Sequence, residues 1–194
     1  FEGVRRAVDL LGGMKDVVRK DDVVLIKPNL VRPAPPPTTT DPRVTAALVR
    51  LCYEAGAAKV YVGEDTATMT RWWREMMNTR RVFELTGMKD EVEKEGGEIL
   101  PFDEHPFIEV EIPHAVTMHR CKVAKAVLDA DVLISNPVMK GSMEGTCTLN
   151  LKLWHGAVEP TTTRLELHRQ DLHQKMVDFY ALIKDCLLYT SDAA

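Results

Sequence analysis

The chain has 194 residues, of which 45% are hydrophobic and 28% are charged, a balance typical of one globular domain with a buried core. Its formal net charge of -4 argues against a general nucleic-acid binder, because such proteins normally carry a basic face. No apolar run approaches the ~20 residues needed to cross a bilayer, so we expect a cytoplasmic protein without membrane contact.

The first predicted elements are a short helix and a buried strand. Apolar residues recur near helical spacing from Val4 to Leu11, and the glycine pair that follows ends this pattern. The β-branched run Val23–Ile26 predicts a strand buried on both faces, and Pro28 interrupts its hydrogen-bond ladder.

A helix and a second strand follow a proline-rich loop over residues 30–40. Either Thr40 or Asp41 can be the N-cap of the helix, with Pro42 in the first turn, and Gly56 is the expected stop. The next strand is predicted over Lys59–Val62. This order makes a βαβ unit, whose strands should be parallel with a right-handed crossover.

The pattern of residues 66–96 predicts a highly charged helical segment, in which Arg71 and Arg74 lie next to two tryptophans. They form either an anion or partner surface, or the solvated face of an amphipathic helix. In residues 108–112 apolar and acidic side chains alternate, which indicates a strand with one wet face.

Further along the chain, Val132–Ile134 predicts a third buried strand, and an apolar stripe from Leu172 to Ile183 predicts a helix. Together these elements predict an α/β fold, specifically a Rossmann-like three-layer domain with a mostly parallel sheet whose C-terminal part is missing.

The domain is expected to be a single incomplete unit over residues 1–185. Residues 186–194 resemble translated adapter read-through at the ends of metagenomic gene fragments, and we expect them to be a non-native tail. The four cysteines form no CxxC pair, so the sequence predicts no metal site and no iron–sulfur cluster held by this chain.

Polar side chains gather where the predicted strands end. Lys27 and Asn29 follow the first strand, Asp65 follows the second, and Asn136 follows the third, with Lys140 shortly after it. Carboxyl ends of parallel strands share one edge of a sheet, where open α/β folds bind ligands. These residues therefore predict a site for a small anionic ligand, with Lys27, Lys140 and Asp65 as catalytic candidates.

Other candidate groups complete this site. The helix start at Asp41 points to the same edge and can hold an anion, and Lys152 brings a third lysine. A desolvated lysine beside other cations can act as a base or a nucleophile, although each lysine could instead be a surface charge or an ion-pair partner. His168 and His155 could meet in space, which the sequence does not decide.

Several motifs together resemble the domain of unknown function 362 family: VLIKPNLV, TTTDPRV, AGAAKVYVGED, DADVLISNPVMK, the segment from Thr148 to Gly156, and LHQKMVD. The resemblance covers about residues 5–185. It implies that the predicted site residues above, His168 included, are characteristic positions. It also implies an association with ferredoxin-like iron–sulfur modules. A departure at Leu153, where the family usually has asparagine after lysine, affects the role of Lys152.

Two functions from different classes follow. One is a redox-linked enzyme acting on a small anionic substrate, with a [4Fe–4S] cluster in the full-length protein or a ferredoxin-like partner. The alternative is a non-catalytic module that binds an anion or docks a redox partner through the Arg/Trp segment. Whether the chain is an enzyme stays open at this point, as does a purely structural role in a larger redox protein.

Overall fold

The computed structural model describes residues 1–66, 77–142, 145–184 and 187–189. Its centre is a sheet in the order β3-β2-β1-β6-β9, in which every neighbouring pair is parallel. The strands are β1 (Val23–Pro28), β2 (Lys59–Glu64), β3 (Glu98–Pro101), β6 (Val132–Asn136) and β9 (Leu187–Tyr189). The expected α/β class with a mostly parallel sheet is confirmed. β9 comes from the segment that we expected to be a non-native tail.

The central strand β1 is buried on both faces. Val24 and Ile26 belong to one hydrophobic cluster, whereas Leu25 belongs to a second cluster on the opposite side of the sheet. Successive side chains of a strand point to opposite faces, so the continuous apolar run of β1 requires a layer of structure on each side. For this reason the residues of β1 form a continuous apolar run and do not alternate between apolar and polar side chains.

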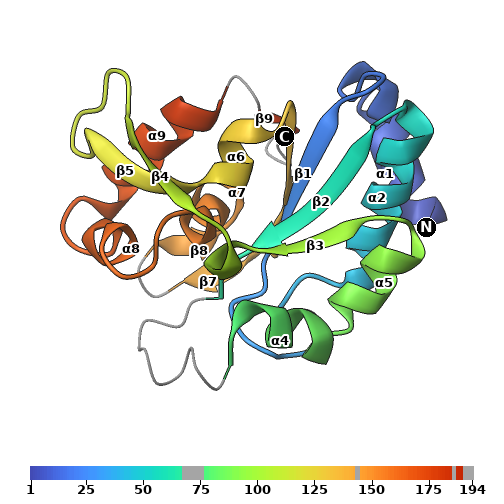
Figure 1. Ribbon diagram of the computed structural model, residues 1–194, viewed down its shortest axis with the longest axis horizontal. Coiled ribbons are helices and arrows are strands. Elements are labelled where there is room, and N and C mark those ends of the chain that lie inside the picture. The colour runs from blue at the N-terminus through green and yellow to red at the C-terminus, as the bar shows by residue number, and fades with distance from the viewer. Residues whose placement is uncertain (67–76, 143–144, 185–186, 190–194) are drawn as a thin grey trace.

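Helices cover the face of the sheet to which Val24 and Ile26 point (Figure 1). They are α1 (Glu2–Leu10), the 3-10 turn η1 (Met14–Asp16), α2 (Pro42–Ala55), α4 (Thr79–Leu85) and α5 (Met88–Lys94). The best defined is α2. The Asp41 carboxylate accepts the Arg43 N–H at 2.9 Å, and Gly56 ends the helix with a φ of 117°, a left-handed conformation that suits glycine. Of the two candidate N-caps, Asp41 is the one that caps α2, and the expected stop at Gly56 is confirmed.

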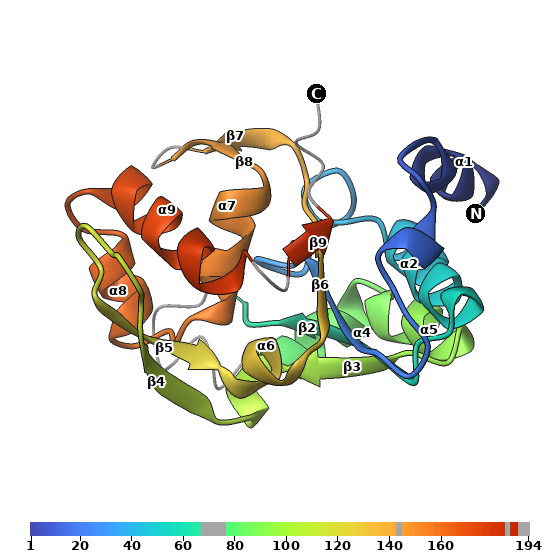
Figure 2. The same cartoon turned by 90° about the horizontal axis from the view of Figure 1, so that it is seen from above.

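The opposite face is covered by a mixed layer, seen from above in Figure 2. It contains the antiparallel ribbon of β4 (Phe107–Glu111) and β5 (Arg120–Ala124), the hairpin of β7 (Lys140–Ser142) and β8 (Thr146–Thr148), the helices α6 (Lys125–Asp129), α7 (Asn150–Leu153), α8 (Thr163–Leu167) and α9 (Leu172–Ile183), and the 3-10 turns η2 (Phe102–Glu104) and η3 (Trp154–Ala157). The third layer is therefore part helix and part ribbon.

The helix expected over residues 66–96 is only partly correct. In its described part the chain forms two short helices, α4 and α5, separated at Gly87, which has a φ of 71°. A left-handed residue cannot continue a right-handed helix, so the segment breaks there. The proposed contact residues Arg71 and Arg74 lie outside the described residues. Among the helices that are described, none is long and apolar enough to cross a membrane.

A buried carboxylate holds the loop between β4 and β5. Asp178 of α9 accepts the backbone N–H groups of Val116, Thr117 and Met118 at 3.1, 2.8 and 2.8 Å, and a hydrogen bond from the Gln174 side chain. Burial disfavours its charge, but these hydrogen bonds outweigh burial and lower the pKa of Asp178 to about 2.

We expect Asp178→Asn to lower the free energy of unfolding by about 2 kcal/mol at neutral pH, because one amide oxygen replaces a charged acceptor of several N–H groups. The folded-state pKa lies below the usual 3.8. This contribution is therefore complete above the unfolded-state pKa and is lost as the pH falls through the folded-state value. Urea unfolding from neutral to acid pH measures both effects.

Asp129→Asn is the matched control, because Asp129 forms an exposed ion pair with Lys125 within α6. It should change stability by less than about 0.5 kcal/mol. Equal losses for the two variants would contradict the role assigned to Asp178.

Candidate functional site

A cavity of about 260 Å³ opens at the edge of the sheet where β1 and β2 end. Most of the residues in its wall are polar or charged and come from strand ends, the hairpin and helices: Asn29, Glu64, Asp65, Lys140, Thr148, Lys152, His155, Arg164 and His168, with Val31, Leu153 and Gly156 beside them. The carboxyl edge of a parallel sheet is where the sequence places its polar residues. The cavity therefore lies at the edge where the sequence places its polar strand ends, and ligand binding there stays a prediction.

A buried ion pair lies at the base of the cavity. The Lys27 ammonium contacts Glu64 Oε1, and both side chains are almost completely buried. The other oxygen of Glu64 accepts the Leu30 N–H at 3.1 Å, and Oε1 also accepts the Asp65 N–H at 2.9 Å. Burial lowers the pKa of Lys27, while the charge of Glu64 opposes that change.

Gly156 allows η3 to lie directly on this ion pair. A Cβ atom at position 156 would come within 2.7 Å of Lys27 Nζ and closer still to Glu64 Oε1. Any larger side chain must therefore displace the pair or the turn. Trp154 anchors the same turn, since its indole N–H donates to the Ser135 hydroxyl in β6 at 2.9 Å.

A second buried ion pair joins α8 to the end of β2. Arg164 lies 3.3 Å from the Asp65 carboxylate, and both side chains are almost inaccessible. The guanidinium also donates to backbone carbonyls of His155, Gly156, Val158 and Thr66. Five N–H groups arranged in a fixed plane suit such a set of acceptors. Arg164 therefore fastens the turn that carries His155 to the sheet.

Two histidines meet beside these ion pairs. The rings of His155 and His168 lie 5.7 Å apart, edge to face. His155 is buried, and neither of its ring nitrogens has a hydrogen-bond partner among the described residues. Burial, followed by the nearby charge of Lys152, lowers the pKa of His155 to about 3. Its imidazole is consequently neutral near pH 7, with one nitrogen as a donor and the other as an acceptor.

Lys140 is the cation of the hairpin. Its ammonium donates to Asn29 Oδ1 at 2.9 Å and to the Thr38 carbonyl at 2.5 Å, so it holds the proline-rich loop against the site. Burial lowers the pKa of Lys140, and the charges of Arg32 and Lys152 lower it further, against an opposing effect of Glu64.

The ends of β1 and β6 are joined by neutral hydrogen bonds. The Thr40 hydroxyl accepts the Asn29 N–H at 2.9 Å and donates to the Asn136 carbonyl at 2.8 Å. The Asn136 amide in turn donates to the Thr45 hydroxyl at 2.9 Å. These contacts fix the backbone on which Asn29 and Lys140 are presented.

The structure brings most of the predicted site residues together. Asn29, Asp65, Lys140, Lys152 and His168 line the cavity. Lys27 lies behind the wall in its ion pair, and Asn136 faces Thr45.

Asp41 does not line the cavity. Its carboxylate caps α2 and binds the Arg43 guanidinium, which lowers the pKa of Asp41. The start of α2 is thus already occupied by its own side chain. Sequence reasoning had not assigned a site role to Glu64 or Arg164, which complete the two buried pairs.

No group of three or more histidine, cysteine or acidic residues among the described parts of the chain could hold a metal ion. Cys52 and Cys121 are buried in different hydrophobic clusters, and Cys147 is exposed on β8. Burial raises the pKa of Cys52 and that of Cys121 to about 12. These residues do not fit the four-thiolate arrangement of a [4Fe–4S] cluster.

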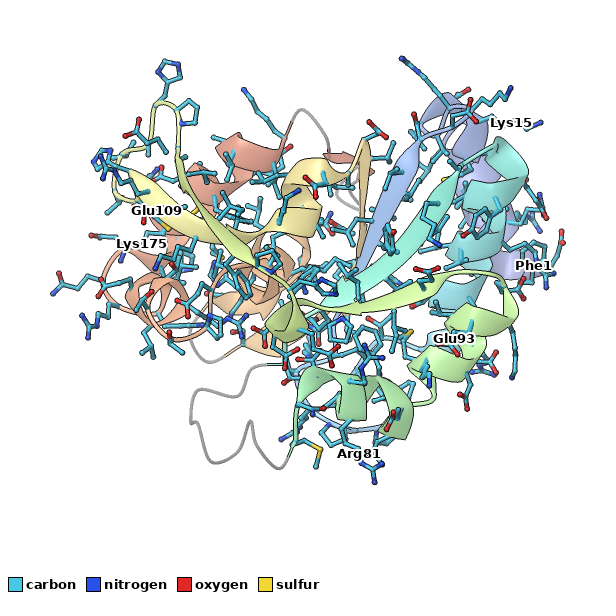
Figure 3. The ribbon with its side chains drawn as sticks, in the orientation of Figure 1. Phe1, Lys15, Arg81, Glu93, Glu109 and Lys175 are labelled. Atoms are coloured by element: carbon cyan, nitrogen blue, oxygen red, sulfur yellow. The ribbon has the colours of Figure 1, made fainter. Side chains whose placement is uncertain are left out.

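A larger cavity, of about 380 Å³, lies between the β4–β5 ribbon and helices α8 and α9. Glu109 and Lys175, both labelled in Figure 3, belong to its wall. Its charged residues are mostly exposed and of both signs, and it lies away from the strand ends. The smaller cavity, with its buried polar groups, is therefore the stronger candidate site.

Comparison with known proteins shows a relative in sequence and a neighbour in structure. The thylakoid-associated protein sll1697 of Synechocystis sp. is 29% identical over 161 residues, which are 80% of this chain and 45% of that protein. The lactate racemase apoprotein from Thermoanaerobacterium thermosaccharolyticum superposes with a TM-score of 0.61 at 18% identity, covering 95% of this chain and 46% of that one. At that identity the likeness shows the α/β fold alone.

The chain thus spans about half the length of both proteins. A family model described as domain of unknown function (DUF362) matches residues 24–193, most of the chain. The resemblance expected from the sequence motifs is confirmed: the protein belongs to the DUF362 family.

Proposed function

We propose that the chain carries the substrate pocket of an enzyme that acts on a small carboxylate-type anion. The observation that carries this proposal is the cavity at the carboxyl edge of the sheet, whose two carboxylates are each held by a buried cation. Glu64 and Asp65 therefore present little net negative charge to a ligand. Lys140 and Lys152 add positive charge to the same wall.

An enzyme is favoured over a passive binding module because the same wall carries groups suited to proton transfer. His155 is neutral, and its ring contacts that of His168. A neutral imidazole in the same cavity as Lys140, whose pKa is lowered by burial, can exchange protons with a bound substrate. A module that only holds an anion has no need for a buried imidazole without hydrogen-bond partners.

The redox link remains part of the proposal and is supported by the family resemblance alone. The described cysteines do not fit an iron–sulfur cluster, so any such cluster would belong to a further segment or to a ferredoxin-like partner. Cytoplasmic location likewise remains a prediction from the sequence.

Isothermal titration calorimetry with oxalate and pyruvate tests the anion pocket. Lys152→Gln and Lys140→Gln should each weaken binding about tenfold, the effect of losing ~1.4 kcal/mol of charge interaction. Raising the salt concentration should weaken binding by the wild-type protein.

Lys175→Gln is the matched control, because Lys175 lines the other cavity. It should bind both anions like the wild-type protein. If neither anion binds, or if all three variants lose affinity equally, the pocket is not the anion site.

A further inference from the structure

We propose that Lys140 is a nucleophile that forms a Schiff base with the carbonyl group of a small 2-oxo carboxylic acid. The inference rests on the anion pocket proposed above and assigns its substrate class. It is carried by the surroundings of the half-buried Lys140 nitrogen, which differ from those of the fully buried Lys27.

The contacts of Lys140 satisfy its neutral amine form as well as its ammonium form, so they do not hold it in the charged state. An amine has two N–H groups and one lone pair, whereas an ammonium has three N–H groups. The nitrogen has two acceptors, Asn29 Oδ1 and the Thr38 carbonyl, and neither carries a charge. Both N–H groups of the amine are then satisfied. One tetrahedral position of the nitrogen is left for the lone pair, on a side chain that lines the cavity.

Lys27 shows the opposite arrangement. It is fully buried, but its partner is the Glu64 carboxylate, which stabilises the ammonium form. Within the described residues Lys140 forms no ion pair, and the cations Arg32 and Lys152 act on it together with burial to lower its pKa. Desolvation and neighbouring cations are the means by which enzymes obtain reactive lysine amines.

The chemistry balances without an added oxidant or reductant. The Lys140 nitrogen forms a bond to the carbonyl carbon, and the carbonyl oxygen leaves as water with the two hydrogens of the amine. The product is an imine between the lysine and the former carbonyl carbon. In a 2-oxo acid the carboxylate is next to the carbonyl, so a carboxylate near Lys152 would place the carbonyl within the same small cavity.

Reductive trapping tests the inference. The full chain is incubated with pyruvate and cyanoborohydride, which reduces an imine to a stable secondary amine, and labelled peptides are mapped by mass spectrometry. We expect Lys140 to be labelled on the order of tenfold faster than Lys175, because a bound acid is held next to the amine. Oxalate, which has no ketone, should slow the labelling of Lys140 only.

Lys140→Arg and Lys140→Gln should both lose the fast labelling while Lys175→Arg keeps it, with circular dichroism confirming that each variant is folded. Calorimetry separates the two proposals. If pyruvate binds in the cavity but Lys140 is labelled no faster than Lys175, the nucleophile is wrong and the anion pocket stands. If pyruvate neither binds nor labels Lys140, both are wrong.

Discussion

Replacing Glu64 with alanine is expected to lower the free energy of unfolding by about 3–5 kcal/mol, because it leaves the Lys27 charge buried without a partner. The Lys27 side chain is completely inaccessible, so water cannot replace the lost carboxylate without a rearrangement. Two backbone N–H groups, those of Leu30 and Asp65, lose their acceptor at the same time. Urea unfolding followed by circular dichroism measures the loss.

Two comparisons show whether burial is the cause. Glu98→Ala removes the partner of Lys59 in an exposed pair and should cost less than about 1 kcal/mol. The double variant Lys27→Met with Glu64→Leu removes both charges and should recover much of the stability lost by Glu64→Ala. A double variant as unstable as the single one would mean that the hydrogen bonds to Leu30 and Asp65, rather than the buried charge, dominate.

Gly156→Ala is expected to have the second large effect, a loss of about 3 kcal/mol or more in the free energy of unfolding. Overpacking a buried site typically costs 1–3 kcal/mol, and here the added methyl group also disturbs the Lys27–Glu64 pair. Because Gly156 lines the cavity, the displaced turn should also weaken the binding of oxalate. Unfolding curves and calorimetry measure the two effects.

Gly141→Ala is the control for Gly156→Ala. A Cβ atom built at Gly141 in β7 has no heavy atom within 4 Å, so the variant should keep wild-type stability and binding. A mild effect of Gly156→Ala, equal to that of Gly141→Ala, would show that the turn can move away from the ion pair.

The parallel part of the fold follows from the sequence because its signals are local. The apolar runs before Lys27, Gly63 and Asn136 mark β1, β2 and β6, and the cap at Asp41 marks the start of α2. Element order and handedness rules then place the strand ends on one edge. The segment that pairs as β9 is only three residues long, and the expectation of a non-native tail removes it from the predicted sheet.

The partners within the site could not be predicted in the same way. Arg164 pairs with Asp65, which lies 99 positions earlier in the sequence. In the sequence, Arg164 cannot be distinguished from a surface arginine of a short helix. Glu64 precedes Asp65 at the strand end, so either acid could have paired with Lys27. Glu64 is the acid that pairs with Lys27 because of the parallel register of β1 with β2 and the position of η3 against these strand ends.

The order of the strands also affects how this chain folds. β1 can pair with β2 as soon as one βαβ unit has been synthesised, but its other edge waits for β6, more than a hundred residues later, where Val24 meets Val132. Contacts of such sequence separation form slowly, and an unpaired apolar edge can meanwhile associate with other chains. The candidate site has residues from the β2 side and from the β6 side of β1. It is therefore complete only after β6 has paired with β1, the slowest pairing of the sheet.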